Sequence, residues 1–268
     1  MSNERESIFL PIWEVQKPLV TYQDQMRIEA GTSTEPFVVL QRDLSLALFG
    51  SYGRLADMSK LFPEIPVRQE VGVRLVKAAQ RLQTINPSLA LQVTYGFRSL
   101  EVQQTYYQQR SLELFNSIYL TEAQKEIIHQ FVAVPEVAGH PTGGAVDLVL
   151  FDSTTQGAVD CGSTIYDLNS PTIQAFSSGL TAQQLQARLL LRQIMMEQGF
   201  APYDGEWWHF SYGDKEWAAY YGLKKAIYPI VTTQQVRIAA NEAWVQLAAS
   251  RDDTLQLTVK RKDVTYES

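Results

Sequence analysis

Two short segments of the chain carry residue types that bind metal ions. In His140-Pro-Thr-Gly-Gly-Ala-Val-Asp147, a histidine in a glycine-containing turn precedes an aspartate. In Glu206-Trp-Trp-His209, a glutamate precedes a second histidine. Imidazole nitrogens and carboxylate oxygens are both zinc ligands, and glycines permit the tight path that such a turn needs. The sequence therefore predicts one Zn²⁺ ion per chain, held by His140, Asp147 and His209.

The predicted ligand set leaves room for chemistry at the metal. Three protein ligands with an open fourth position are typical of a catalytic zinc site, and such a zinc lowers the pKa of its bound water to about 7. Glu206 is predicted to be the general base that takes the water's proton and passes it to a leaving amine. Because positions three apart on a strand point to opposite faces, we expect Glu206 at the strand's mouth and His209 inside.

A third segment, Tyr95-Gly-Phe-Arg98, follows an expected strand directly. A guanidinium fixed at that place is suited to stabilising the oxyanion of a tetrahedral intermediate, or to holding a substrate carboxylate. We therefore count Arg98 as a second candidate catalytic residue.

Hydrophobic periodicity predicts the elements that position these segments. Asp147 is expected on the strand face opposite Val146 and Leu148. A possible capping box, Thr181 with Gln184, begins one helix. The expected helices cover residues 67–86, 99–117, 121–132, 181–198 and 233–249, and the expected strands cover 90–95, 145–150, 207–212 and 255–259, with a long loop over 152–178.

Composition limits the function classes. The chain has 268 residues, is 45% hydrophobic and 19% charged, and has a formal net charge of −6, which argues against nucleic acid as a partner. It shows neither a basic segment followed by an apolar export signal nor an apolar run long enough for a membrane span, so we expect a cytoplasmic protein. A single cysteine, Cys161, fits a reducing compartment. The oligomeric state cannot be read from the sequence.

The motifs H-x-x-G-x-A-x-D and E-x-W-H, with G-[YF]-R upstream, resemble those of the D-alanyl-D-alanine dipeptidase family. That family includes the vancomycin-resistance dipeptidases and is related to the zinc D,D-carboxypeptidases. The resemblance covers about residues 67–226 and extends to Cys161-Gly-Ser-Thr-Ile-Tyr-Asp167 and to Gly199-Phe200. Four motifs in this order are far more specific than any one of them alone.

The resemblance implies a role for each site residue. It implies that His140, Asp147 and His209 bind zinc, that Glu206 is the catalytic acid and base, and that Arg98 stabilises the transition state. It also suggests that Asp167 receives the free amino group of the substrate. Apart from the resemblance, adjacent strand residues face opposite ways, so one of Trp207 and Trp208 is expected in the core and one in the pocket wall, and Trp208 is predicted to bind the substrate. His129 and Cys161 lack such a context and are expected to be structural.

One departure from the family pattern leaves alternatives open. The family usually has a serine, thought to contact the substrate amine, two residues before the first histidine, where this chain has Ala138. The predicted activity is hydrolysis of D-Ala-D-Ala or a closely related dipeptide. A D,D- or L,D-carboxypeptidase acting on longer peptidoglycan stem peptides is the alternative that Ala138 keeps open. A non-enzymatic zinc-binding recognition module is a third, although Glu206 and Arg98 argue against it.

The order of elements lacks a regular βαβ repeat and indicates an α+β fold. We expect a single domain with a small antiparallel sheet and flanking helices, similar to hedgehog domains and D,D-peptidases. The expected organisation is an N-terminal wrap over residues 1–40 with short strands at best, a zinc peptidase domain over 41–229, and a C-terminal extension over 230–268 packed on the same domain.

Overall fold

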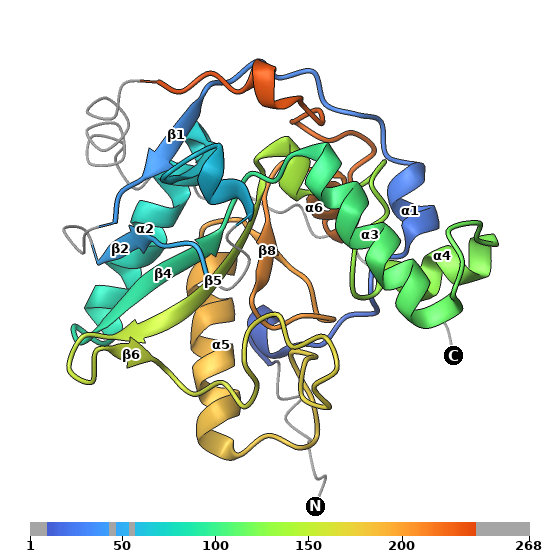
Figure 1. Ribbon diagram of the computed structural model, residues 1–268. Helices are drawn as coiled ribbons and strands as arrows, with labels where there is room; N and C mark the ends of the chain where they lie inside the picture. Colours follow the sequence, from blue (N-terminus) through green and yellow to red (C-terminus); the bar gives the residue numbers. More distant parts are fainter. Residues whose placement is uncertain (1–9, 43–46, 54–56, 240–268) are drawn as a thin grey trace, which may run out of the picture.

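A mixed sheet forms the centre of the molecule (Figure 1). The computed structural model describes residues 10–42, 47–53 and 57–239. The strands of the main sheet run in the order β2-β4-β5-β8-β7, with β6 paired to β5, and a second sheet joins β1 to β3. The strands are β1 (Phe37–Leu40), β2 (Leu48–Gly50), β3 (Ile65–Arg68), β4 (Leu89–Tyr95), β5 (Ala145–Asp152), β6 (Gly157–Ala158), β7 (Ala201–Pro202) and β8 (His209–Ser211).

The helices form two groups. In one, α2 and α5 pack against each other and against strands of the main sheet; in the other, α4 contacts both α1 and α3, and α1 also contacts α6 (Figure 1). The α-helices are α1 (Tyr22–Met26), α2 (Gln69–Ile85), α3 (Leu100–Phe115), α4 (Glu122–His129), α5 (Ala182–Glu197) and α6 (Lys215–Tyr220). Short 3₁₀ helices cover Ile12–Glu14, Asp57–Lys60, His140–Thr142 and Thr233–Gln235.

Apolar periodicity and N-terminal capping residues mark the helices as expected from the sequence. The apolar residues of α2 that recur at helical spacing and lie in the main core are Val71, Leu75, Ala78, Ala79 and Leu82. The capping box of Thr181 and Gln184 begins α5, and a second one, Thr121 with Gln124, begins α4. Ser99 caps α3 by accepting a hydrogen bond from the Val102 N–H.

The sheet differs from the predicted antiparallel one. All pairs of the main sheet are antiparallel except β2 with β4, which run parallel. A parallel pair needs a crossover connection, and β3 and α2 supply it here. The prediction of helices and strands mixed in one domain holds, and the prediction of a purely antiparallel sheet is wrong.

Several predicted boundaries also shift. The helix expected from residue 67 begins at Gln69, because Val67 lies in β3 and pairs with Val38. The N-terminal segment contains α1 as well as a strand. Near the C-terminus, Thr233–Gln235 is one 3₁₀ turn, and Ile238 then bridges to Phe37, so the helix expected over 233–249 does not begin there. Residues 240–249 and the strand expected over 255–259 lie outside the described residues.

The N-terminal segment is tied to the domain by a buried ion pair. Arg192 in α5 contacts Asp204, and both side chains are almost fully buried. Asp204 Oδ2 accepts a hydrogen bond from the Lys17 N–H at 2.8 Å, and Arg192 donates to the Val15 carbonyl at 3.2 Å.

In the part of the chain that the structure describes, no helix has the length and apolar character needed to cross a membrane. The predicted domain limits and cytoplasmic location stay predictions.

Strand register explains how the motifs meet. Asp147 in β5 lies opposite Tyr95 of β4 on one side and opposite His209 of β8 on the other. Tyr95 leads directly into the segment that carries Arg98, whose N–H donates to the His140 carbonyl. Three segments far apart in the sequence therefore converge at one end of the sheet.

Candidate active site and metal centre

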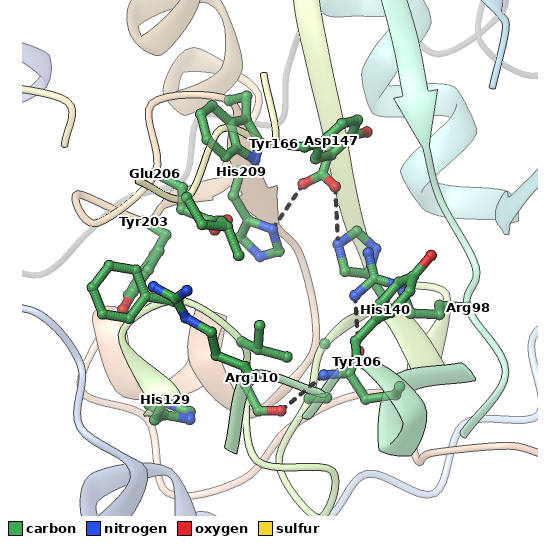
Figure 2. Close-up of a pocket in the computed structure, with 18 of the residues that line it drawn as sticks. Arg98, Tyr106, Arg110, His129, His140, Asp147, Tyr166, Tyr203, Glu206 and His209 are labelled. Atoms are coloured by element: carbon green, nitrogen blue, oxygen red, sulfur yellow. Dashed lines mark hydrogen bonds and ion pairs between the residues drawn. The ribbon is translucent and has the colours of Figure 1, made fainter. Parts of the chain in front are cut away.

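Two histidines and an aspartate form the centre of the site (Figure 2). His140 Nε2 lies 3.3 Å from Asp147 Oδ2, and His209 Nδ1 lies 2.9 Å from Asp147 Oδ1. One ligand atom from each residue lies within 4.8 Å of the other two, and all three residues are buried. Zinc with bonds of about 2.0–2.1 Å in a tetrahedron holds its ligands about 3.3 Å apart, so these spacings suit one ion.

The hydrogen bonding of His140 also suits a cation. Its Nδ1 lies 2.7 Å from the carbonyl oxygen of Gly96, which can only accept, so Nδ1 carries the proton. Burial lowers the pKa of His140 to about 4, against the opposing effect of Asp147, so the ring is neutral near pH 7. The lone pair of Nε2 then faces a carboxylate oxygen. Two acceptors facing each other are stabilised by a positive ion between them.

Asp147 and His209 carry opposite charges in the metal-free protein. Burial acts to raise the pKa of Asp147, but His140 and His209 outweigh it and hold that pKa well below its usual range. Burial acts to lower the pKa of His209, but Glu216 and Asp147 raise it to about 10. A proton on His209 therefore partly balances the buried carboxylates, and metal binding would release it.

A tight turn sets the position of His140. Gly143 ends the 3₁₀ turn with a φ of 76°, in the left-handed region. The ring of Phe37 lies 2.2 Å from the place where a Cβ at Gly143 would stand. The Thr142 hydroxyl donates to the Gly139 carbonyl and accepts from the Gly144 N–H. Glycine is required at position 143 by both backbone angle and space.

Glu206 reaches the site through a turn instead of a strand. Its N–H donates to the Tyr203 carbonyl, and its own carbonyl accepts from the His209 N–H at 3.2 Å. The strand predicted over 207–212 therefore begins at His209. Glu206 lines the same cavity as the two histidines, and burial raises its pKa to about 8, against the opposing effect of His209. A carboxyl group with a pKa close to neutral is suited to taking and giving protons.

Arg98 is held in place by aromatic rings and by one amide. Its guanidinium carbon lies 4.4 Å from the ring centre of Tyr95 and 5.0 Å from that of Tyr106. Its Nη1 donates to Gln103 Oε1 at 2.9 Å, while Gln103 Nε2 donates to the Ala133 carbonyl at 2.8 Å. Arg98 Nε has no hydrogen-bond partner among the residues that the structure describes. The cation is therefore fixed and has donor capacity left for a ligand.

These side chains line a cavity of about 230 Å³. Trp208 lies in its wall beside Tyr166, whereas the Trp207 indole donates to the Ser163 hydroxyl outside it. Asp167 is exposed and is not among the lining residues; its carboxylate accepts from the Asn169 N–H within a turn. The structure thus gathers all but one of the predicted site residues, and Asp167 is the exception. Their chemical roles stay predictions.

The cavity also contains residues that the sequence interpretation missed. Gln103 follows Arg98 on the next helix, Tyr166 stands beside Asp167 in the same motif, and Glu216 comes from α6. Tyr166 could have been predicted as a site residue from the sequence, since it belongs to the motif that ends at Asp167. Nothing in the local pattern marked Glu216. The missed lining residues with polar or charged side chains are Gln103, Tyr106, Gln109, Arg110, Glu113, Tyr166, Tyr203 and Glu216.

His129 and Cys161 fit the structural roles predicted for them. His129 Nδ1 accepts from the Val134 N–H at 3.2 Å, and its Nε2 lies 3.0 Å from the Gln25 amide. Cys161 is buried, and burial raises the pKa of its thiol to about 12, which keeps it protonated and unreactive.

A buried His-Asp-His group, with a carboxyl group and a fixed guanidinium in one cavity, defines the metallohydrolase class of site. Residues 66–227 match the model of the Peptidase_M15 family, described as D-ala-D-ala dipeptidase. The chain belongs to the D-alanyl-D-alanine dipeptidase family, and the predicted membership is confirmed.

Curated relatives agree with this assignment. A D-alanyl-D-alanine dipeptidase of Synechocystis sp. is 32% identical over 182 residues, which are 59% of this chain and 73% of that protein. A D-alanyl-D-alanine dipeptidase of Enterococcus faecium is 33% identical over 82 residues, 31% of this chain and 40% of the other.

Solved structures show a weaker likeness. The vancomycin resistance D,D-pentapeptidase VanY, as an E175A mutant with Zn(II), is 17% identical with a TM-score of 0.37, over 69% of this chain and 93% of that one. The D,D-dipeptidase VanXYg with a D-Ala-D-Ala phosphinate analog is 16% identical with a TM-score of 0.35, over 85% and 74%. Likeness at this level supports no statement about the present chain.

Proposed function

We propose that this protein is a zinc-dependent dipeptidase that hydrolyses D-Ala-D-Ala or a closely related dipeptide. The observation that carries the proposal is the buried group of His140, Asp147 and His209 in one cavity with Glu206 and Arg98. Family membership supports the substrate class. The proposal includes one zinc ion per chain and a cytoplasmic location, where free dipeptide would be met.

The residues divide the chemistry between them. A zinc ion held by the His-Asp-His group would supply a positive charge that acidifies water and polarises a carbonyl. Glu206 takes a proton on its carboxylate and delivers it to the nitrogen of the leaving amino acid. Arg98 offers N–H donors to the substrate oxygen on which negative charge develops. Gln103 fixes the orientation of the Arg98 guanidinium.

The size of the cavity supports a small substrate. Its volume of about 230 Å³ is below the range of about 300–1,000 Å³ typical of pockets for drug-sized ligands. Tyr106 and Arg110, both from α3, line it together with the residues of the metal centre (Figure 2). A carboxypeptidase acting on longer stem peptides is the second candidate, because Ala138 lines the cavity without a polar group for a substrate amine.

Comparing two substrates tests the proposal. The zinc-loaded protein is given D-Ala-D-Ala or a pentapeptide that ends in D-Ala-D-Ala, and released D-alanine is measured. We expect release from the dipeptide, little from the pentapeptide, and a loss of about 10²–10⁴-fold in the Glu206→Gln variant. Release from the pentapeptide alone would replace the dipeptidase by the carboxypeptidase. Release from neither, with zinc bound, would contradict both.

A further inference from the structure

The loop over residues 161–175 reaches the cavity without a helix or strand of its own. Its side chains Tyr166 and Leu168 line the cavity wall. In a loop of this kind the backbone groups lack the regular partners that a helix or strand provides, so other residues must supply them. The position of this part of the wall therefore depends on contacts from outside the loop.

Arg188 in α5 supplies three such contacts from one buried side chain. The residue is 3% exposed, and its Nε donates to the Cys161 carbonyl at 2.7 Å. Its Nη1 and Nη2 donate to the carbonyls of Gln174 and Thr172, each at 2.6 Å. A guanidinium presents its donors in one rigid plane. A single side chain thus holds the beginning of the loop against its end.

No carboxylate forms an ion pair with Arg188 within the described parts of the chain. Burial lowers the pKa of its guanidinium to about 10, which still leaves the side chain charged near pH 7. A buried cation is costly unless hydrogen bonds replace its hydration, and here the loop carbonyls provide them. Moving the loop away would leave the charge without these partners, so the cation and the loop fix each other.

Trp207 joins the same loop to the turn that carries Glu206. Its indole N–H donates to the Ser163 hydroxyl at 2.9 Å, and its backbone N–H donates to the Ile173 carbonyl at 3.2 Å. The guanidinium carbon of Arg188 lies 5.4 Å from the centre of the Trp207 ring, within the range of a cation–π contact. The loop and the turn therefore pack around one cation.

We propose that Arg188 is a positioning residue, which holds the loop and the Glu206 turn so that their side chains form one wall of the dipeptide site. This inference rests on the proposed dipeptidase function. It gives the motif over residues 161–167 a task in this contact, since the Cys161 carbonyl is an acceptor for the guanidinium. In the described structure the hydrogen bonds of Arg188 reach the loop and none of the three proposed metal ligands. Its loss should therefore affect substrate binding more than zinc binding.

A role in fold stability alone would give a different pattern of results. In Arg188→Lys the positive charge stays, but a single ammonium group does not replace the planar fork that reaches both ends of the loop. If Arg188 only stabilised the fold, this variant would unfold more easily and keep the KM of the wild-type protein. The matched control is Arg74→Lys. Arg74 Nη1 donates to the Gln198 carbonyl at 2.6 Å, at the C-terminal end of α5, and Arg74 is not among the cavity-lining residues.

The experiment measures backbone amide hydrogen exchange, kcat, KM for D-Ala-D-Ala and zinc content in the wild-type protein and both variants. Two amides report on the contact between loop and turn, namely the Ala175 N–H, which donates to the Asp204 carbonyl at 3.0 Å, and the Trp207 N–H. In Arg188→Lys we expect both amides to exchange about 10–100-fold faster and KM to rise by a similar factor, with zinc content unchanged and kcat changed less than KM. Arg74→Lys should keep KM and these two exchange rates within about twofold of the wild-type values.

Three outcomes would overturn the inference. One is an unchanged KM in Arg188→Lys with faster exchange throughout the chain, which would leave fold stability as the only role of Arg188. Another is unchanged exchange at Ala175 and Trp207. The third is a loss of zinc from Arg188→Lys at an unchanged KM.

A second variant keeps the test decisive if Arg188→Lys does not fold. Ser163→Ala removes the acceptor of the Trp207 indole and should raise KM by about 3–10-fold. An unchanged KM in that variant would contradict the inference. If the wild-type protein does not hydrolyse the dipeptide, the proposed function fails, and the exchange measurement still decides whether Arg188 fixes the loop.

Discussion

Asp147 contacts both histidines of the site, each through a different carboxylate oxygen. The aspartate and each histidine are so close that they do not take up protons independently. The protonation state of one group affects the pKa of the others. Around this centre Glu206 and Arg98 differ in how they are held. Glu206 depends on a backbone turn, whereas Arg98 depends on the side chain of Gln103.

Gln103 is expected to matter for turnover although it is not proposed to touch the substrate. In Gln103→Leu, an Arg98 N–H and the Ala133 carbonyl each lose a buried partner. We expect kcat to fall at least about tenfold and the free energy of unfolding to fall by about 1–3 kcal/mol. Steady-state kinetics and urea unfolding measure both, with the exposed Gln104→Leu on the same helix as the control. Unchanged kcat in Gln103→Leu would show that Arg98 needs no such support.

Sequence spacing was enough to predict the residues that share a short motif. His140 and Asp147 are joined by one turn and one strand, so their approach is a local matter. Glu216 was not predicted, because its place in the cavity wall depends on how α6 packs against the rest of the domain. Asp167 was assigned on the family resemblance, and its role stays a prediction. Tyr166 has a φ of 68°, a left-handed conformation, and it is Tyr166 that lines the cavity whereas Asp167 is exposed in a turn. A motif match gives the order of the residues but not the backbone angle that decides which of two neighbours lines the cavity.

Strands β4, β5 and β8 bring the residues of the local motifs together in one site. Their register aligns Tyr95, Asp147 and His209 across the sheet. The sequence predicted all three strands but not this register, which is set by long-range pairing. The alternation argument also failed at Trp207 and Trp208, since both lie in a turn before β8. The expected outcome, one tryptophan in the cavity wall and one outside it, is nevertheless observed.

The turn that carries His140 should be sensitive to one methyl group. In Gly143→Ala the added Cβ would meet the Phe37 ring, and the φ of 76° disfavours any side chain. We expect a loss of about 1–3 kcal/mol in the free energy of unfolding, together with weaker zinc binding. The control is Gly157→Ala, where a Cβ meets nothing within 4 Å. Equal stability of the two variants in urea unfolding would contradict this account of the turn.

At the scale of the whole molecule, the described residues of the predicted N-terminal wrap are part of the domain's packing. Phe37 and Val38, which were assigned to an N-terminal wrap, are buried and pair with β3. Gln25 of α1 contacts His129 of α4, which lies at the edge of the cavity. The sequence predicts a wrap with short strands at best but not helix α1, because short elements without strong periodicity gain their structure from the core against which they pack.

His129 should make the stability of the whole molecule depend on pH. Burial lowers its pKa from 6.5 to about 4, so between these values the unfolded chain binds a proton that the folded protein does not. Its contribution is present above pH 6.5 and is lost as pH falls toward 4, by about 3 kcal/mol. The free energy of unfolding, measured from pH 7 to 4, should fall more steeply for the wild-type protein than for His129→Gln. Parallel curves would show that His129 already titrates normally in the folded state.

His140, Asp147 and His209 are proposed to form a catalytic zinc site. This is tested by titrating the metal-free protein with zinc while following D-alanine release from D-Ala-D-Ala. We expect no release without metal, a linear rise in release up to one equivalent of zinc, and no rise in Asp147→Asn. Full activity in the metal-free protein, or unchanged zinc-dependent activity in Asp147→Asn, would contradict it.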